Sequence, residues 1–73
     1  MFLSELQNKD IISIRTGENI GRIMDAEIDS TGKILKFYVE QKKVFRKYFS
    51  NNEITFKFSE IEKIGADVIL VKI

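Results

Sequence analysis

The side chains that most often carry out catalysis are missing from this sequence, which holds no histidine and no cysteine. General acid–base catalysis most often uses histidine, and nucleophilic catalysis uses cysteine or a serine that is paired with histidine. No serine stands in a G-x-S-x-G elbow, the turn that exposes the nucleophile of many hydrolases. We therefore expect that the chain is not an enzyme and uses no cofactor.

Three carboxylates at alternate positions, Asp25, Glu27 and Asp29, are the best cluster for a hard cation. On a strand this spacing puts them on one face, with neighbours about 7 Å apart. Calcium needs six to eight oxygens that converge at about 2.3–2.6 Å, which a straight strand does not provide. We interpret the row as a solvated acidic face, paired with Lys36 across a hairpin, and expect no metal site.

The middle of the chain is basic, because residues 33–57 contain seven lysines and arginines against Glu40 and Glu53. Within it, residues 41–49 interleave cations with aromatic side chains. We take these as the candidate partner-binding residues: Lys42, Lys43, Phe45, Arg46, Lys47, Tyr48 and Phe49.

Three interpretations of residues 41–49 stay open. They form a hairpin or loop with solvated cations and aromatics that cap the barrel end, or a protein-docking patch, since Tyr, Phe and Arg are enriched at interfaces. Alternatively, they grip single-stranded RNA by phosphate contacts and base stacking. A net charge of +1 argues against nucleic acid, whose binding proteins usually carry a larger basic excess.

Alternation of apolar and polar residues, the period of a half-buried strand, dominates the chain. It predicts strands at 10–14, 20–29, 34–40 and 53–58. Residues 30–33 contain Gly32 and make the tight turn of a hairpin. The faces expected to be apolar comprise Met24, Ala26 and Ile28 in one run, Leu35, Phe37 and Val39 in the next, and Ile54, Phe56 and Phe58 in the last.

The last 15 residues combine a helix signal with a strand. Ser59 followed three positions later by Glu62 has the pattern of a capping box, which predicts one short helical turn near residues 60–64 with Gly65 as its C-cap. Residues 67–73 form a strand that is apolar on both faces. Because such strands are usually covered on both sides, we expect Val68 and Leu70 to form a homodimer interface.

We expect a single domain over residues 1–73. Its fold class is mostly β: a small, closed or nearly closed antiparallel barrel of five or six strands with one helical turn. The composition, 44% hydrophobic and 32% charged, suits a folded soluble domain. No signal-peptide pattern and no run of about 20 apolar residues is present, so we expect a cytoplasmic protein that is not in a membrane.

With these elements in place, the chain resembles a PRC-barrel domain. The opening matches at residues 4–6, 9–12, 17, 20–23 and 25, and the more specific match is the ending, residues 58–65 and 67–71. The ending is similar to the short, single-domain YlmC/YmxH type, which is associated with sporulation. The resemblance departs in residues 41–52, and Lys57 and Phe58 stand where such proteins often carry proline and tryptophan.

The resemblance implies a six-stranded barrel that acts as an adaptor. PRC-barrels occur in the H subunit of the photosynthetic reaction centre and in RimM, a maturation factor that binds the small ribosomal subunit. A non-catalytic scaffold that docks a protein partner is therefore the function we expect. The alternative is an RNA- or ribosome-associated factor of the RimM type, which would use residues 41–49.

Overall fold

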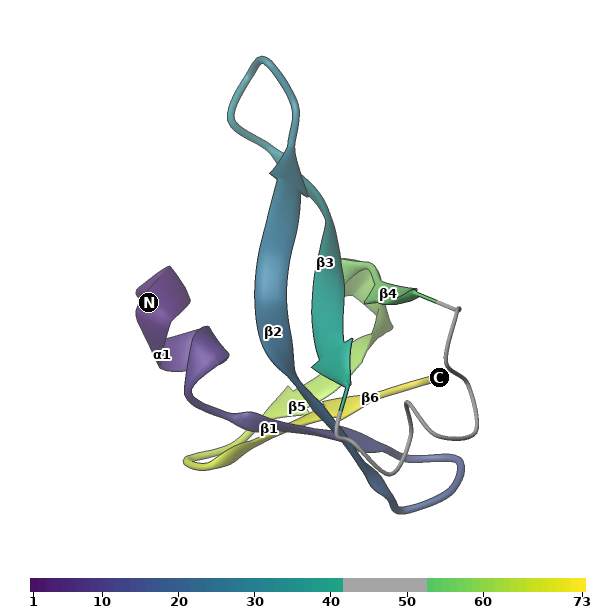
Figure 1. Cartoon of the computed structure of the whole chain (residues 1–73). Helices are drawn as coiled ribbons and strands as arrows, with labels where there is room; N and C mark the ends of the chain where they lie inside the picture. Colours follow the sequence, from purple (N-terminus) through teal and green to yellow (C-terminus); the bar gives the residue numbers. More distant parts are fainter. Residues whose placement is uncertain (42–52) are drawn as a thin grey trace.

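The computed structural model describes residues 1–41 and 53–73, and in these residues six strands form one curved sheet (Figure 1). The strand order is β4-β3-β2-β1-β6-β5. The elements in chain order are α1 (Leu3–Gln7), β1 (Asp10–Ser13), β2 (Asn19–Ile28), β3 (Ile34–Gln41), β4 (Ile54–Phe56), the 3-10 turn η1 (Phe58–Glu60), β5 (Ile61–Ile64) and β6 (Val68–Val71). The predicted fold class, a mostly β PRC-like barrel, is confirmed as a half-barrel.

The β2–β3 hairpin that the alternation predicts is present, and Asp29 holds its turn. Asp29 Oδ1 accepts hydrogen bonds from the Thr31 hydroxyl at 2.6 Å, the Thr31 N–H at 2.9 Å and the Lys33 N–H at 3.0 Å. These bonds, first the one from the Thr31 hydroxyl, lower the pKa of Asp29 because they favour the charged carboxylate. Gly32 follows with a φ of +90°, a conformation that favours glycine.

The core lies on the concave side of the sheet. Phe37 and Phe56 meet there with ring centroids 5.2 Å apart, and Ile11 and Ile69 are fully buried beside each other on β1 and β6. The buried apolar residues are Leu6, Ile11, Ile20, Ile23, Phe37, Val39, Phe56, Ile69 and Val71. Leu6 shows why α1, which the alternation did not predict, forms: its one buried side chain covers the core.

The sheet is mixed, whereas the sequence predicted an antiparallel one. β1 and β6 run parallel, with a register from Asp10↔Val68 to Ser13↔Val71. Alternation predicts that a segment is a strand, but it contains no information on which strand lies beside it. The alternation therefore could not predict that the first strand pairs with the last.

The predicted helical turn lies at Phe58–Glu60, and residues 61–64 form a strand instead. The capping glutamate is Glu60, not Glu62: the Lys57 N–H donates to Glu60 Oε1 at 2.8 Å. Ile61 and Ile64, whose spacing of three indicated a helix, both reach the core because a bulge between Ile61 and Lys63 shifts the register against β6.

Two further boundaries differ from the prediction. Gly65 ends a strand, not a helix, and its N–H donates to the Val68 carbonyl at 2.8 Å in the β5–β6 turn. The strand predicted at 53–58 ends at Phe56, and Phe58 lies in η1 with 47% of its surface exposed. Its ring centroid still lies 6.3 Å from that of Phe37, so it borders the core without entering it.

Candidate partner-binding surface

The outer part of the β2–β3 hairpin extends beyond the rest of the sheet (Figure 1). β1 pairs with β2 only at Asn19 and Gly21, and β4 pairs with β3 only from Phe37 to Val39. Residues 24–36 therefore form a two-stranded ribbon, which we call the arm. Because a ribbon of two strands has few neighbours to bury its side chains, the composition of its faces decides what it can do.

Two register shifts shape the arm. The ladder runs from Ile23↔Val39 to Asp25↔Tyr38, which leaves Met24 as an extra residue in β2. It also passes from Glu27↔Lys36 to Ile28↔Ile34, which leaves Leu35 as an extra residue in β3. Both extra residues are apolar and exposed, so the bulges bring apolar side chains into solvent.

One face of the arm, which carries Ala26, Ile28 and Ile34, continues from the core. Ala26 pairs with the buried Phe37, so this face leads outward from the core to Ile28. Met24 is 54% exposed, Ile28 56% and Leu35 41%. The sequence predicted a half-buried face for Met24, Ala26 and Ile28. Only Ala26 is half-buried. The bulge takes Met24 out of the alternation, and Ile28 lies farther out along the arm.

We define the apolar surface as the exposed apolar side chains of the arm and of η1: Met24, Ile28, Leu35 and Phe58. Phe58 joins the arm residues because η1 contacts β3 and its ring lies near that of Phe37. On the other side of the hairpin, α1 contacts β2 (Figure 1). Exposed apolar side chains that gather on one part of a small domain are typical of a protein-interaction site.

The opposite face of the arm is polar and internally paired. Lys36 Nζ lies 3.8 Å from Glu27 Oε1 and 5.4 Å from the centre of the Tyr38 ring. The Tyr38 hydroxyl donates to the same carboxylate oxygen at 3.4 Å. The predicted pairing of the acidic row with Lys36 is thus confirmed at Glu27. Within residues 1–41 and 53–73, no group of three or more Asp and Glu side chains is arranged to hold a metal ion.

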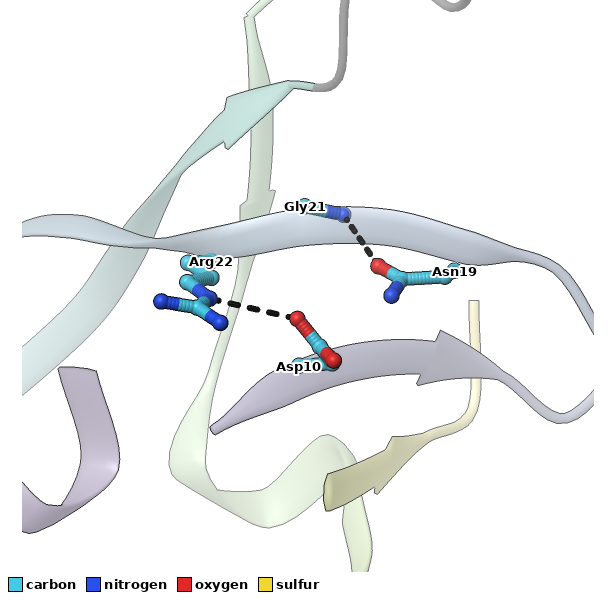
Figure 2. Close-up of polar contacts among 4 residues, drawn as sticks. All are labelled: Asp10, Asn19, Gly21 and Arg22. Atoms are coloured by element: carbon cyan, nitrogen blue, oxygen red, sulfur yellow. Dashed lines mark hydrogen bonds and ion pairs between the residues drawn. The ribbon is translucent and has the colours of Figure 1, made fainter. Parts of the chain in front are cut away.

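The arm is fixed to the sheet at Gly21, where three strands meet (Figure 2). Gly21 has a φ of +142°, and a Cβ there would lie 2.0 Å from the Glu40 carbonyl oxygen. Its N–H donates to Asn19 Oδ1 at 3.1 Å. Beside it, Arg22 Nε lies 3.2 Å from Asp10 Oδ1 and joins β2 to β1. This base holds the arm in a defined direction.

The residues selected from the sequence fall in two places. Lys42, Lys43, Phe45, Arg46, Lys47, Tyr48 and Phe49 lie outside the described residues. Val68 and Leu70 are half-buried on the face of β6 opposite the fully buried Ile69 and Val71, and Leu70 lies beside Ile12. A homodimer through Val68 and Leu70 stays a prediction.

Sequence reasoning missed the apolar surface, although the signal was present. The alternation placed Met24, Ile28 and Leu35 on apolar faces, and only the ends of β1 and β4 show that nothing in the described residues covers them.

Among the residues that the structure describes, no helix has the length and apolar character needed to span a membrane.

Comparison with known proteins identifies the family of the chain. The PRC-barrel domain family matches residues 1–73, and the chain belongs to that family. It is similar to the probable sporulation protein YlmC of Bacillus subtilis, with 36% identity over 73 residues that cover 97% of this chain and 90% of that protein.

Two uncharacterized proteins are also similar. YmxH of Bacillus subtilis is 32% identical over 76 residues, which cover 100% of this chain and 89% of YmxH. A protein of Clostridium acetobutylicum is 33% identical over 70 residues, which cover 94% of this chain and 80% of that protein.

Proposed function

We propose that this chain is a non-catalytic binding and scaffold module that docks a protein partner through the apolar surface of the arm. The observation that carries the proposal is the exposure of Met24, Ile28 and Leu35 on a two-stranded ribbon that extends beyond the rest of the sheet. Exposed apolar side chains of this kind gain free energy when they leave water, at about 25 cal/mol per Å² of apolar area.

The chemistry of the apolar surface suits a protein partner. Methionine and leucine are flexible and adapt to an irregular apolar partner, and an aromatic side chain such as Phe58 is a frequent interface anchor. The framework is also suited to docking, because Gly21 and the Arg22–Asp10 pair fix the base of the arm. A preorganised surface loses little conformational entropy when it binds.

The cellular context of the proposal comes from the relatives. The chain is similar to a protein named as a probable sporulation protein over 97% of its length, which supports a role in sporulation. We place that role in the cytoplasm, where a small domain without cysteine needs no disulfide for stability.

A cross-linking pull-down from sporulating cells tests the proposal. The variant Ile28→Lys puts a charge on the apolar surface, and Ile14→Lys is the matched control, since Ile14 is 46% exposed and lies outside the arm. We expect a defined partner that is captured by the unchanged protein and by the control, and whose yield falls about tenfold with Ile28→Lys. Equal capture of that partner by all three proteins would overturn the proposal.

A further inference from the structure

We infer that α1 is a lid that opens by itself while the six-stranded sheet stays folded. In the closed state, α1 holds Leu6 in the core. In the open state, residues 1–8 leave the sheet, and both Leu6 and the part of the core that it covers reach solvent. The inference concerns the chain alone and does not depend on the proposed function.

A single buried side chain attaches α1 to the rest of the domain. Leu6 is 4% exposed and belongs to the core, whereas Leu3, one turn earlier, is 44% exposed and Phe2 is 74% exposed. α1 stands beside β2, and the segment that leads into β1 joins it to the sheet (Figure 1). The apolar contact of α1 with the domain therefore depends mainly on Leu6.

The hydrogen bonds of α1 are local. In the described part of the chain, the hydrogen bonds of residues 1–8 stay within the first nine residues. An example is the Asn8 N–H, which donates to the Ser4 carbonyl at 3.2 Å. These bonds shape the helix, but they do not hold it against the sheet.

The anchor to the sheet begins abruptly at the next two residues. Lys9 Nζ donates to the Gly65 carbonyl at 2.8 Å, and the Asp10 N–H donates to the Asp67 carbonyl at 2.9 Å. Lys9 therefore marks the fixed side of a hinge. On the other side of this hinge, α1 can swing away without breaking any of the anchoring bonds.

The closed state is only moderately favoured. A helix of five residues is too short to be stable alone, so its order depends on docking against the sheet. Burial of one leucine side chain favours the closed state by about ten- to a hundredfold. Opening the sheet requires unfolding of the domain, a state at least about a thousandfold rarer than the native one. α1 is therefore a local unit that opens far more often than the sheet.

Thiol labelling tests the inference directly, because the chain has no cysteine and each variant then carries a single thiol. Leu6→Cys reports on the lid and Ile11→Cys on the sheet, since both positions are buried, and Leu3→Cys is the exposed reference. A soluble aromatic disulfide is reacted with each variant at neutral pH, without denaturant and in low urea.

We expect Leu6→Cys to react within about a hundredfold of the rate of Leu3→Cys. It should react at least about tenfold faster than Ile11→Cys. Low urea should accelerate the reaction of Ile11→Cys much more than that of Leu6→Cys, because opening the lid exposes little surface. Equal rates and an equal urea dependence at the two buried positions would overturn the inference.

Amide exchange of the unchanged chain is a second measurement that needs no substitution. The Asn8 N–H is bonded within α1 and the Asp10 N–H is bonded to the sheet, so the two amides lie on either side of the hinge. After correction for intrinsic rates, Asn8 should exchange at least about tenfold faster than Asp10. Matching protection of the two amides would show that α1 opens only together with the sheet, and would refute the lid.

Discussion

The ammonium group of Lys9 donates a hydrogen bond of 2.8 Å to the carbonyl oxygen of Gly65, a residue 56 positions later in the chain. The same group donates to the Ala66 carbonyl at 2.7 Å. Just beyond, the Asp10 N–H donates to the Asp67 carbonyl at 2.9 Å. One lysine between α1 and β1 therefore holds the β5–β6 turn against the start of the sheet.

Removing this ammonium group should destabilise the fold. Lys9→Met keeps most of the aliphatic chain and removes both hydrogen bonds, so we expect the free energy of unfolding to fall by about 1–2 kcal/mol. Lys63→Met is the control, since Lys63 is exposed and should change stability by less than about 0.5 kcal/mol. Urea denaturation measures both, and equal values for the two variants would contradict the role given to Lys9.

Gly21→Ala should be among the most damaging single substitutions in the described residues. The new Cβ would meet the Glu40 carbonyl oxygen at 2.0 Å, which forces β2 and β3 apart at the base of the arm. We expect a loss of about 3 kcal/mol in the free energy of unfolding. Gly32→Ala provides the comparison, because its φ is +90° but no atom lies within 4 Å of the new Cβ. It should cost only about 1 kcal/mol. The reverse order in thermal or urea unfolding would exclude this explanation.

Asp29 should make stability depend on acid pH. Its pKa is lower in the folded chain than its ordinary value of 3.8, so the unfolded chain takes up the proton first as pH falls. The stabilisation is complete above the unfolded pKa and is lost as the pH falls through the folded pKa. Asp29→Asn should therefore flatten the fall in Tm below about pH 4.

Thr31→Val provides an independent check on Asp29, because it removes the hydroxyl that lowers the pKa most. The carboxyl carbon of Asp29, followed by NMR, should then titrate at a higher pH than in the unchanged chain. An unaltered titration would show that the Thr31 hydroxyl does not stabilise the charged form.

Val68 and Leu70 lead to a prediction about assembly. They are half-buried on the outer face of β6, opposite two fully buried residues, and a second copy that covers them would remove them from water. We expect light scattering to find a dimer at high micromolar concentration and a monomer for Leu70→Lys. A strict monomer for the unchanged chain at that concentration would end the homodimer hypothesis.

The parts of the fold that depend on local pattern could be predicted from the sequence. Alternation predicted β2 and β3, and the residues around Gly32 predicted their turn, because both signals lie within a few positions. The pairing of β1 with β6 depends on residues almost sixty positions apart and leaves no local signal. The same limit explains the error at residues 61–64, where two isoleucines three apart fit either a helical turn or a bulged strand.

The candidate surface was missed for a related reason. Apolar residues at Met24, Ile28 and Leu35 were recognised, but an apolar face in a sequence does not reveal whether a neighbouring element covers it. That depends on where β1 and β4 stop pairing along the hairpin. The local charge pair of Glu27 and Lys36 was predictable, because cross-strand neighbours follow directly from the hairpin register.

The parallel pairing of β1 with β6 has a consequence during synthesis on the ribosome. Ile11, fully buried against Ile69, has no neighbour on that side of β1 until residues 68–71 have left the exit tunnel. The nascent chain can form its central hairpin early, because those contacts are local, and β1 can pair with β2. The other edge of β1 stays unpaired until β6 has been made. Until β6 has been made, the first strand is therefore the segment most exposed to chaperones and to aggregation.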